Sequence, residues 1–167
     1  PWSTIIRLIV DQGFAVKLCG PVEPCEGYLA DTDEQRAPPL HRLWADEEVR
    51  AILAIRGGFG CLRLAGLLDW ELFTRTPKWL IGFSDVTLLL NTLFRRCGLV
   101  SVHGPVATSL ARSDEQSLVS LFTLLTGTVE ERIRPRGLEV LRGGTGRGPL
   151  VGGNLTTLVH LLGTPWD

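Results

Sequence analysis

The sequence feature that most constrains the fold is the turn Gly82-Phe83-Ser84, which joins two apolar segments. The segment before it, 79–81, predicts a buried strand, and the segment after it, 86–94, predicts a buried helix. A strand, a sharp turn and a helix form the geometry of a nucleophile elbow, which lifts a serine hydroxyl out of the sheet. Ser84 is therefore a candidate nucleophile. The alternative that these residues leave open is that Ser84 or Asp85 only caps the helix.

A second turn, Arg56-Gly57-Gly58-Phe59-Gly60, follows an apolar segment at 50–55 that predicts another strand. Three glycines in four residues allow the backbone to come close to a ligand or a neighbouring loop. The residues alone leave three interpretations open: a cradle for an anion or oxyanion, a tight turn without a ligand, and a phosphate site. The phosphate site lacks the usual Gly-x-Gly-x-x-Gly and Gly-x-x-x-x-Gly-Lys patterns.

Predicted helices and strands alternate along the chain. Periodic apolar residues predict helices at 2–12, 32–44, 61–68, 114–126 and 155–162, and short apolar runs predict strands at 14–18, 99–102 and 138–141. Pro38-Pro39 predicts a kink or a late start in the second helix, because an internal proline removes a hydrogen bond. The alternation indicates an α/β domain with a mostly parallel sheet and helices on both faces, of the Rossmann or flavodoxin-like kind.

Three candidate residues or turns fall at the ends of predicted strands. In parallel sheets, ligands bind outside the carboxyl ends of the strands. The glycine-rich turn, Ser84 and His103 each lie at such an end, so we expect them at one edge of the sheet. A single histidine is more often structural than functional, and that alternative stays open for His103.

Composition narrows the functional classes. The chain has 167 residues, a net charge of −1 and no basic cluster, which argues against binding to nucleic acid or to an anionic membrane surface. Its apolar runs are shorter than the roughly 20 residues that span a bilayer. Four cysteines without a Cys-x-x-Cys pair argue against zinc and favour a reducing, cytoplasmic location. Because methionine is absent, we expect that the sequence does not begin where its gene begins.

Together these motifs resemble the LD-carboxypeptidases, a family of serine peptidases also called muramoyltetrapeptide carboxypeptidases. The most specific similarity is Arg-Gly-Gly-Phe-Gly followed at this spacing by Gly-Phe-Ser-Asp. The matching segments are 27–30, 33–36, 51–60, 68–69, 81–87, 103–105, 150–155 and 162–165.

The resemblance implies a Ser-His-Glu triad in which Ser84 is the nucleophile. It also implies an oxyanion hole formed by the backbone N–H of Asp85 and that of Gly57 or Gly58. Phe59, His103 and Asn154 are expected to line the substrate pocket. The implied substrate is a murein tetrapeptide, from which the enzyme releases terminal D-alanine by way of an acyl-enzyme, with no metal or other cofactor. A homodimer is compatible with the resemblance.

The resemblance also defines the expected domain organisation. In this family the catalytic Glu and His lie in a C-terminal domain beyond the Gly-Thr-Pro segment, and no residue of this chain matches either position. We therefore expect residues 1–167 to form an N-terminal, nucleophile-bearing domain that lacks the first strand of the family and, by itself, lacks activity.

Three alternative functions are retained. The first is a peptidase of the microcin C self-immunity type within the same family. The second is a non-catalytic α/β domain that holds an anion in the glycine-rich turn. The third is a structural or assembly module.

Overall fold

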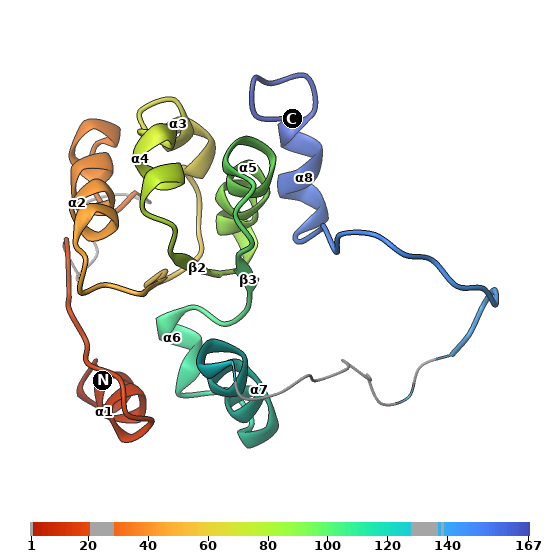
Figure 1. Cartoon of the computed structure of the whole chain (residues 1–167), viewed down its shortest axis with the longest axis horizontal. Helices are drawn as coiled ribbons and strands as arrows, with labels where there is room; N and C mark the ends of the chain where they lie inside the picture. The colour runs from red at the N-terminus through yellow and green to blue at the C-terminus, as the bar shows by residue number, and fades with distance from the viewer. Residues whose placement is uncertain (1, 21–28, 128–136, 138) are drawn as a thin grey trace. The chain divides into compact units, whose positions relative to one another are not determined.

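The computed structural model describes residues 2–20, 29–127, 137 and 139–167 (Figure 1). These residues divide into two compact units. The first comprises residues 1–113 together with 152–167, and the second comprises residues 114–151. The candidate site belongs to the first unit. Two residues of the family-like segment at 27–30, Gly27 and Tyr28, lie outside the described residues.

The first unit is built on a three-stranded parallel sheet in the order β1-β2-β3. Its strands are β1 (Ala51–Leu53), β2 (Trp79–Gly82) and β3 (Val102–His103). The register pairs Leu53 with Ile81 and Gly82 with His103. Because all three strands run in the same direction, the turns that follow them meet at one edge of the sheet, as the sequence predicts.

Helices flank this sheet on two sides. The helices of the first unit are α1 (Trp2–Asp11), α2 (Asp33–Ala45), α3 (Cys61–Ala65), α4 (Trp70–Arg75), α5 (Thr87–Cys97), α6 (Ala107–Leu110) and α8 (Leu155–Leu161). In Figure 1, α2 to α5 lie on one side of the strands, and α1 and α6 lie on the other. The predicted α/β class with a parallel sheet is confirmed. Within the described ranges, no helix has the length and apolar character needed to cross a bilayer.

The core forms between the sheet and α2 to α5. Trp44 and Phe73 are almost fully buried, and their rings stack with centroids 4.1 Å apart. Leu88 and Leu93 of α5 are each 1% exposed. Burial of one such side chain contributes about 1.5–3 kcal/mol, so the packing fixes α5 firmly against the sheet. The turn that carries Ser84 leads directly into this helix.

The second unit contains helix α7 (Glu115–Thr126), which confirms the helix predicted at 114–126. Asp114 caps it, because its Oδ1 accepts a hydrogen bond of 2.9 Å from the N–H of Ser117. Gly127 ends the helix with a φ of +67°, the left-handed conformation that glycine adopts readily.

Two strand predictions are wrong. Residues 14–18 form no strand. Lys17 in this segment forms ion pairs with Asp46 and Glu48. The neighbouring Leu18 is half exposed. At 138–141, Leu138 lies outside the described residues and the remainder is not a strand. Val140 and Leu141 are 75% and 91% exposed there, so these two apolar side chains are not buried against the residues that the structure describes.

Of the two alternatives predicted at Pro38-Pro39, a kink or a late start, the late start does not occur, because α2 runs from Asp33 through both prolines to Ala45. The two prolines remove the N–H groups that would bond the carbonyls of Glu34 and Gln35. Both of these residues are exposed, so water can bond their carbonyls instead. Helices α4 and α6 were not predicted, since each is too short to show a clear apolar period.

Candidate active site

Ser84 lies in a strained turn at the carboxyl end of β2. Its φ is +61°, and among the described residues it is the only residue other than glycine with a positive φ. Such a conformation costs of order 1–3 kcal/mol and persists only where the surrounding structure enforces it. Ser84 begins the 3₁₀ turn η1 (Ser84–Val86), which continues into α5. The strand, sharp turn and helix predicted from the sequence are therefore present.

Gly82 is needed immediately before this turn because there is no room for a side chain. A Cβ at position 82 would lie 2.8 Å from Cγ1 of Val86 and 3.2 Å from Cβ of Ala54. The absence of a side chain at Gly82 therefore lets the chain reverse from β2 into η1 without displacing β1.

The glycine-rich turn packs directly against Ser84. A Cβ at Gly57 would lie 3.1 Å from Cβ of Ser84 and 3.4 Å from its Oγ. The backbone of Gly57 is thus close enough to face whatever the serine hydroxyl contacts. Gly58 follows with a φ of +140°, a backbone conformation that other residues rarely adopt.

The side chain of Asp85 connects the two turns. Its Oδ2 accepts a hydrogen bond of 2.9 Å from the backbone N–H of Cys61, the first residue of α3. On the other side of the loop, Arg36 of α2 donates to the carbonyl of Gly60 at 2.9 Å. The sequence analysis assigned no role to Arg36 or to the Asp85 carboxylate. The only signal for Arg36 was its place in the family-like segment 33–36.

Charged groups around the loop are strongly paired. Asp33 accepts from Arg36 at 2.6 Å and from Arg63 at 2.6 Å. Hydrogen bonds from Arg36 first, and then from Arg63, hold the pKa of Asp33 below its usual range.

Burial raises the pKa of the Cys61 thiol well above its usual value, and the nearby Asp85 carboxylate adds to this effect. Cys61 is therefore a protonated thiol at neutral pH, which makes it a weak nucleophile.

Residues 152–157 return to the start of α5, far from their position in the sequence. The N–H of Asn154 donates to Oγ1 of the fully buried Thr87 at 3.1 Å, and Oγ1 of Thr157 donates to the carbonyl of Ser84 at 3.4 Å. A Cβ at Gly153 would lie 2.3 Å from Cγ2 of Thr87, so only glycine fits there.

Three further residues are predicted to line the substrate pocket, and the structure gives the position of each. His103 ends β3 beside Gly82, at the same sheet edge as Ser84, and is exposed. Phe59 is 56% exposed at the tip of the glycine-rich turn. Asn154 uses its side-chain Oδ1 to cap α8, where it accepts from the N–H of Thr157 at 3.1 Å. Their contribution to a substrate pocket stays a prediction.

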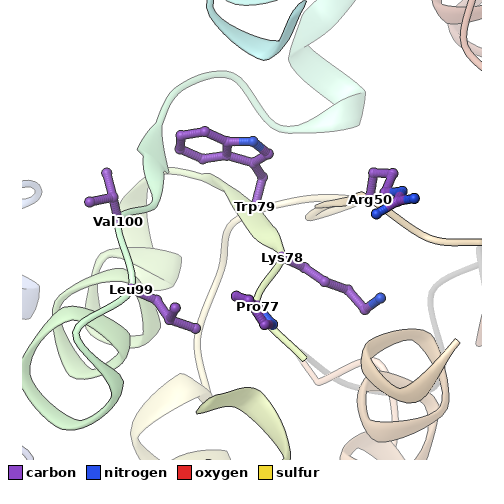
Figure 2. A pocket seen from close by; sticks show the side chains of 6 residues that line it. All are labelled: Arg50, Pro77, Lys78, Trp79, Leu99 and Val100. Carbon is purple, nitrogen blue, oxygen red and sulfur yellow. The ribbon is translucent and has the colours of Figure 1, made fainter. Parts of the chain in front are cut away.

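A shallow pocket of about 320 Å³ lies at the opposite edge of the sheet (Figure 2). Its lining residues precede or begin the three strands: Arg50, Pro77, Lys78, Trp79, Leu99 and Val100. Nζ of Lys78 is engaged by the carbonyls of Asp46 and Val49, at 2.7 and 2.6 Å, and burial lowers its pKa. None of the six lining residues is a serine, cysteine or histidine, so the candidate chemistry resides at the Ser84 edge.

Comparison with known proteins decides the family. A model of the LD-carboxypeptidase N-terminal domain matches residues 2–104. The chain belongs to the LD-carboxypeptidase family. The Ser84 turn, the glycine-rich turn and Arg36 lie within the matched range, whereas Gly153, Asn154 and Thr157 lie beyond it.

Individual LD-carboxypeptidase relatives agree with this assignment. A probable murein peptide carboxypeptidase of Bacillus subtilis is 36% identical over 99% of this chain and 53% of its own length. The murein tetrapeptide carboxypeptidase of Pseudomonas aeruginosa is 41% identical over 95% of this chain and 54% of its own length. The crystal structure of the muramoyltetrapeptide carboxypeptidase from Oxalobacter formigenes superimposes with a TM-score of 0.81 at 26% identity, covering 99% of this chain and 56% of that one. The chain thus spans about half the length of the curated relatives it matches.

Proposed function

We propose that the full-length protein containing this chain is a serine LD-carboxypeptidase that releases terminal D-alanine from murein tetrapeptide. The observation that carries the proposal is the strained Ser84 turn with the backbone of Gly57 packed against it. Backbone strain of this kind is concentrated at functional sites. An ordinary helix cap does not require a positive φ, so capping alone does not explain the conformation of Ser84. The names of the relatives support the murein substrate.

In the proposed reaction, Ser84 Oγ attacks the carbonyl carbon of the peptide bond that precedes the D-residue. The hydroxyl proton passes to a general base as the C–O bond forms, and the carbonyl oxygen becomes an oxyanion. The N–H of Asp85 and that of Gly57 or Gly58 stabilise this oxyanion. The C–N bond then breaks, and the protonated base returns its proton to the leaving amine of D-alanine. Water hydrolyses the resulting ester and restores Ser84.

The general base is assigned to residues outside this chain. Among the described residues, no side chain forms a hydrogen bond with the Ser84 hydroxyl. Family resemblance assigns the catalytic Glu and His to a C-terminal domain, and we expect that domain to supply the base. Phe59 and His103 are proposed to contact the peptide from the sheet edge. A cytoplasmic location is proposed because the three described cysteines, Cys19, Cys61 and Cys97, are free thiols.

The test is D-alanine release by the full-length protein and by its Ser84→Ala variant. We expect the variant to lose on the order of 10⁴-fold or more in kcat, since no other group forms the ester. Ser120→Ala, at an exposed position of α7, is the matched control and should retain wild-type activity. Release of D-alanine at equal rates by Ser84→Ala and wild type would refute the proposal. Ser84-dependent cleavage of a peptidyl nucleotide instead of murein peptide would favour the microcin C self-immunity type.

A further inference from the structure

We propose that Arg36 is a positioning residue of this site, and that it acts together with the carboxylate of Asp85 on one peptide group, the bond between Gly60 and Cys61. The inference rests on the proposed function, because it concerns the loop that would form the oxyanion hole. Its geometric basis is independent of any substrate.

The two contacts act on opposite ends of the same peptide unit. The carbonyl of Gly60 accepts from Arg36 at 2.9 Å, and the N–H of Cys61 donates to Oδ2 of Asp85 at 2.9 Å. A cation therefore faces the negative end of the peptide dipole and a carboxylate faces its positive end. Hydrogen bonds with a charged partner are about twice as strong as those between neutral groups. Rotation of this peptide plane would break both bonds at once.

Arg36 is itself held in place. Its side chain is 15% exposed and rises from α2, 24 residues away from Gly60 in the sequence. The same nitrogen that bonds Gly60 also bonds Asp33, one helical turn earlier, at 2.6 Å. Asp33 is in turn bonded by Arg63 from α3. The guanidinium thus reaches the loop from a rigid helix with its charge already compensated.

The clamped peptide has an unusual need for such support. Gly60 has a φ of +114° and is followed at once by α3, so the loop must leave a left-handed conformation and enter a helix within one residue. Three of the four residues from Gly57 to Gly60 have no side chain that could restrict the backbone. The first of them, Gly57, packs against Ser84, and the last is held by Arg36 and Asp85. The loop is thereby fixed at both ends relative to the nucleophile.

This arrangement predicts a specific kinetic consequence. An oxyanion forms only in the transition state, so a misplaced oxyanion donor lowers kcat and leaves substrate binding largely intact. Loss of one such donor lowers kcat by about 10²–10³-fold, and loss of its support should have a smaller effect. We expect Arg36→Ala in the full-length protein to lower kcat about 10- to 100-fold, with KM changed less than about threefold.

Arg63→Ala is the matched control. Arg63 bonds the same carboxylate of Asp33 at the same 2.6 Å distance, whereas the bond to Gly60 comes from Arg36. A purely structural contribution of the Asp33 ion pairs would lower activity similarly in both variants. We expect Arg63→Ala to keep kcat within about twofold of wild type. Equal losses in the two variants, or a loss in neither, would overturn the proposal.

A second variant keeps the test decisive if Arg36→Ala does not fold. Arg36→Lys keeps the charge, but its side chain is one bond shorter, so its ammonium reaches less well the two acceptors that a single guanidinium nitrogen bonds in the wild type. We expect it to fold like wild type and to lose kcat to a smaller extent than Arg36→Ala. Wild-type kcat in Arg36→Lys together with a folded, fully active Arg36→Gln would contradict the assignment.

Hydrogen exchange at the Cys61 amide separates this proposal from the proposed function. If the wild-type protein releases no D-alanine, the proposed function fails, but the clamp can still be measured by NMR. We expect the Cys61 N–H to exchange at least about tenfold faster in Arg36→Gln than in Arg63→Gln, because only the first substitution removes the charged donor to Gly60 and leaves its carbonyl with the 3.1 Å bond from the N–H of Leu64. Equal exchange rates in the two variants would show that Arg36 does not hold this peptide.

Discussion

Two glycine-rich segments of this chain have similar composition and opposite environments. In the segment from Gly57 to Gly60, backbone atoms pack against Ser84, and a cation and a carboxylate hold the final peptide bond. In the segment from Gly143 to Gly148, a Cβ at any of the four glycines would meet no described atom within 4 Å. Glycine is thus required in the first segment by close approach, whereas in the second only Gly144, with a φ of +154°, has a backbone conformation that favours glycine.

The comparison indicates what separates a constrained glycine loop from an unconstrained one. Both segments would be equally permissive in an isolated peptide, because glycine populates positive and negative φ alike. In the first segment, Phe83 and residues of α2 and η1 restrict that freedom to one conformation. Functional glycine loops can therefore be recognised by the groups that constrain them more than by their glycine content.

The largest expected effect is on the free energy of unfolding when a glycine of each segment is replaced by alanine. Gly60→Ala places a Cβ 2.7 Å from Leu29 and 2.8 Å from Arg36, at a φ of +114°. We expect it to lower the free energy of unfolding by about 2 kcal/mol. Gly146→Ala, in open space, should change it by less than about 0.5 kcal/mol. Urea unfolding of both variants measures the two values. Equal values would remove the distinction between the segments.

A smaller effect is expected on catalysis at the first glycine of the loop. Gly57→Ala would bring a methyl group 3.1 Å from Cβ of Ser84 and 3.4 Å from its Oγ. The resulting shift of a few tenths of an ångström should lower the kcat of the full-length protein about tenfold, since catalysis is sensitive to such displacement. Gly143→Ala is the control and should be as active as wild type. Full activity of Gly57→Ala would show that the loop does not face the reacting atoms.

The smallest effect concerns the pH dependence of the ion pairs beside the loop. Because Arg36 and Arg63 hold the pKa of Asp33 below its value in the unfolded chain, their stabilisation is present at neutral pH. It is lost as the pH falls through the folded-state pKa, below about pH 4. Asp33→Asn should therefore melt at a lower temperature than wild type at pH 7, and the difference should shrink towards pH 3. A difference that stays constant over this range would argue against the ionic contribution.

Much of the site region was predictable from the sequence. The apolar segments at 79–81 and 86–94 predicted the strand and helix on either side of Ser84, because both are buried and have regular spacing. The alternation of elements predicted the parallel sheet, and with it the common edge shared by Ser84, the glycine-rich turn and His103. The helix predicted at 155–162 is also present as α8, and Asn154 caps it, as a residue type that favours this position.

The contacts that fix the loop were not predictable in the same way. Arg36 and Gly60 are 24 residues apart, as are Cys61 and Asp85, and no local pattern links such pairs. The strand prediction for residues 14–18 was wrong for the opposite reason. Its local pattern favours a strand, but a strand also requires a partner, and residues 14–18 pair with none among those the structure describes.

The return of residues 152–157 to α5 has a consequence in terms of polymer statistics. Ser113 and Gly152 both belong to the first unit, so the chain leaves this unit after one and returns to it at the other. The entropic cost of closing a flexible loop grows only logarithmically, by about 0.6 kcal/mol for each doubling of its length. Residues 114–151 could therefore be lengthened or shortened considerably while Asn154 still reaches Thr87. A change in chain length between these two points should therefore alter the free energy of the structure around Ser84 only slightly.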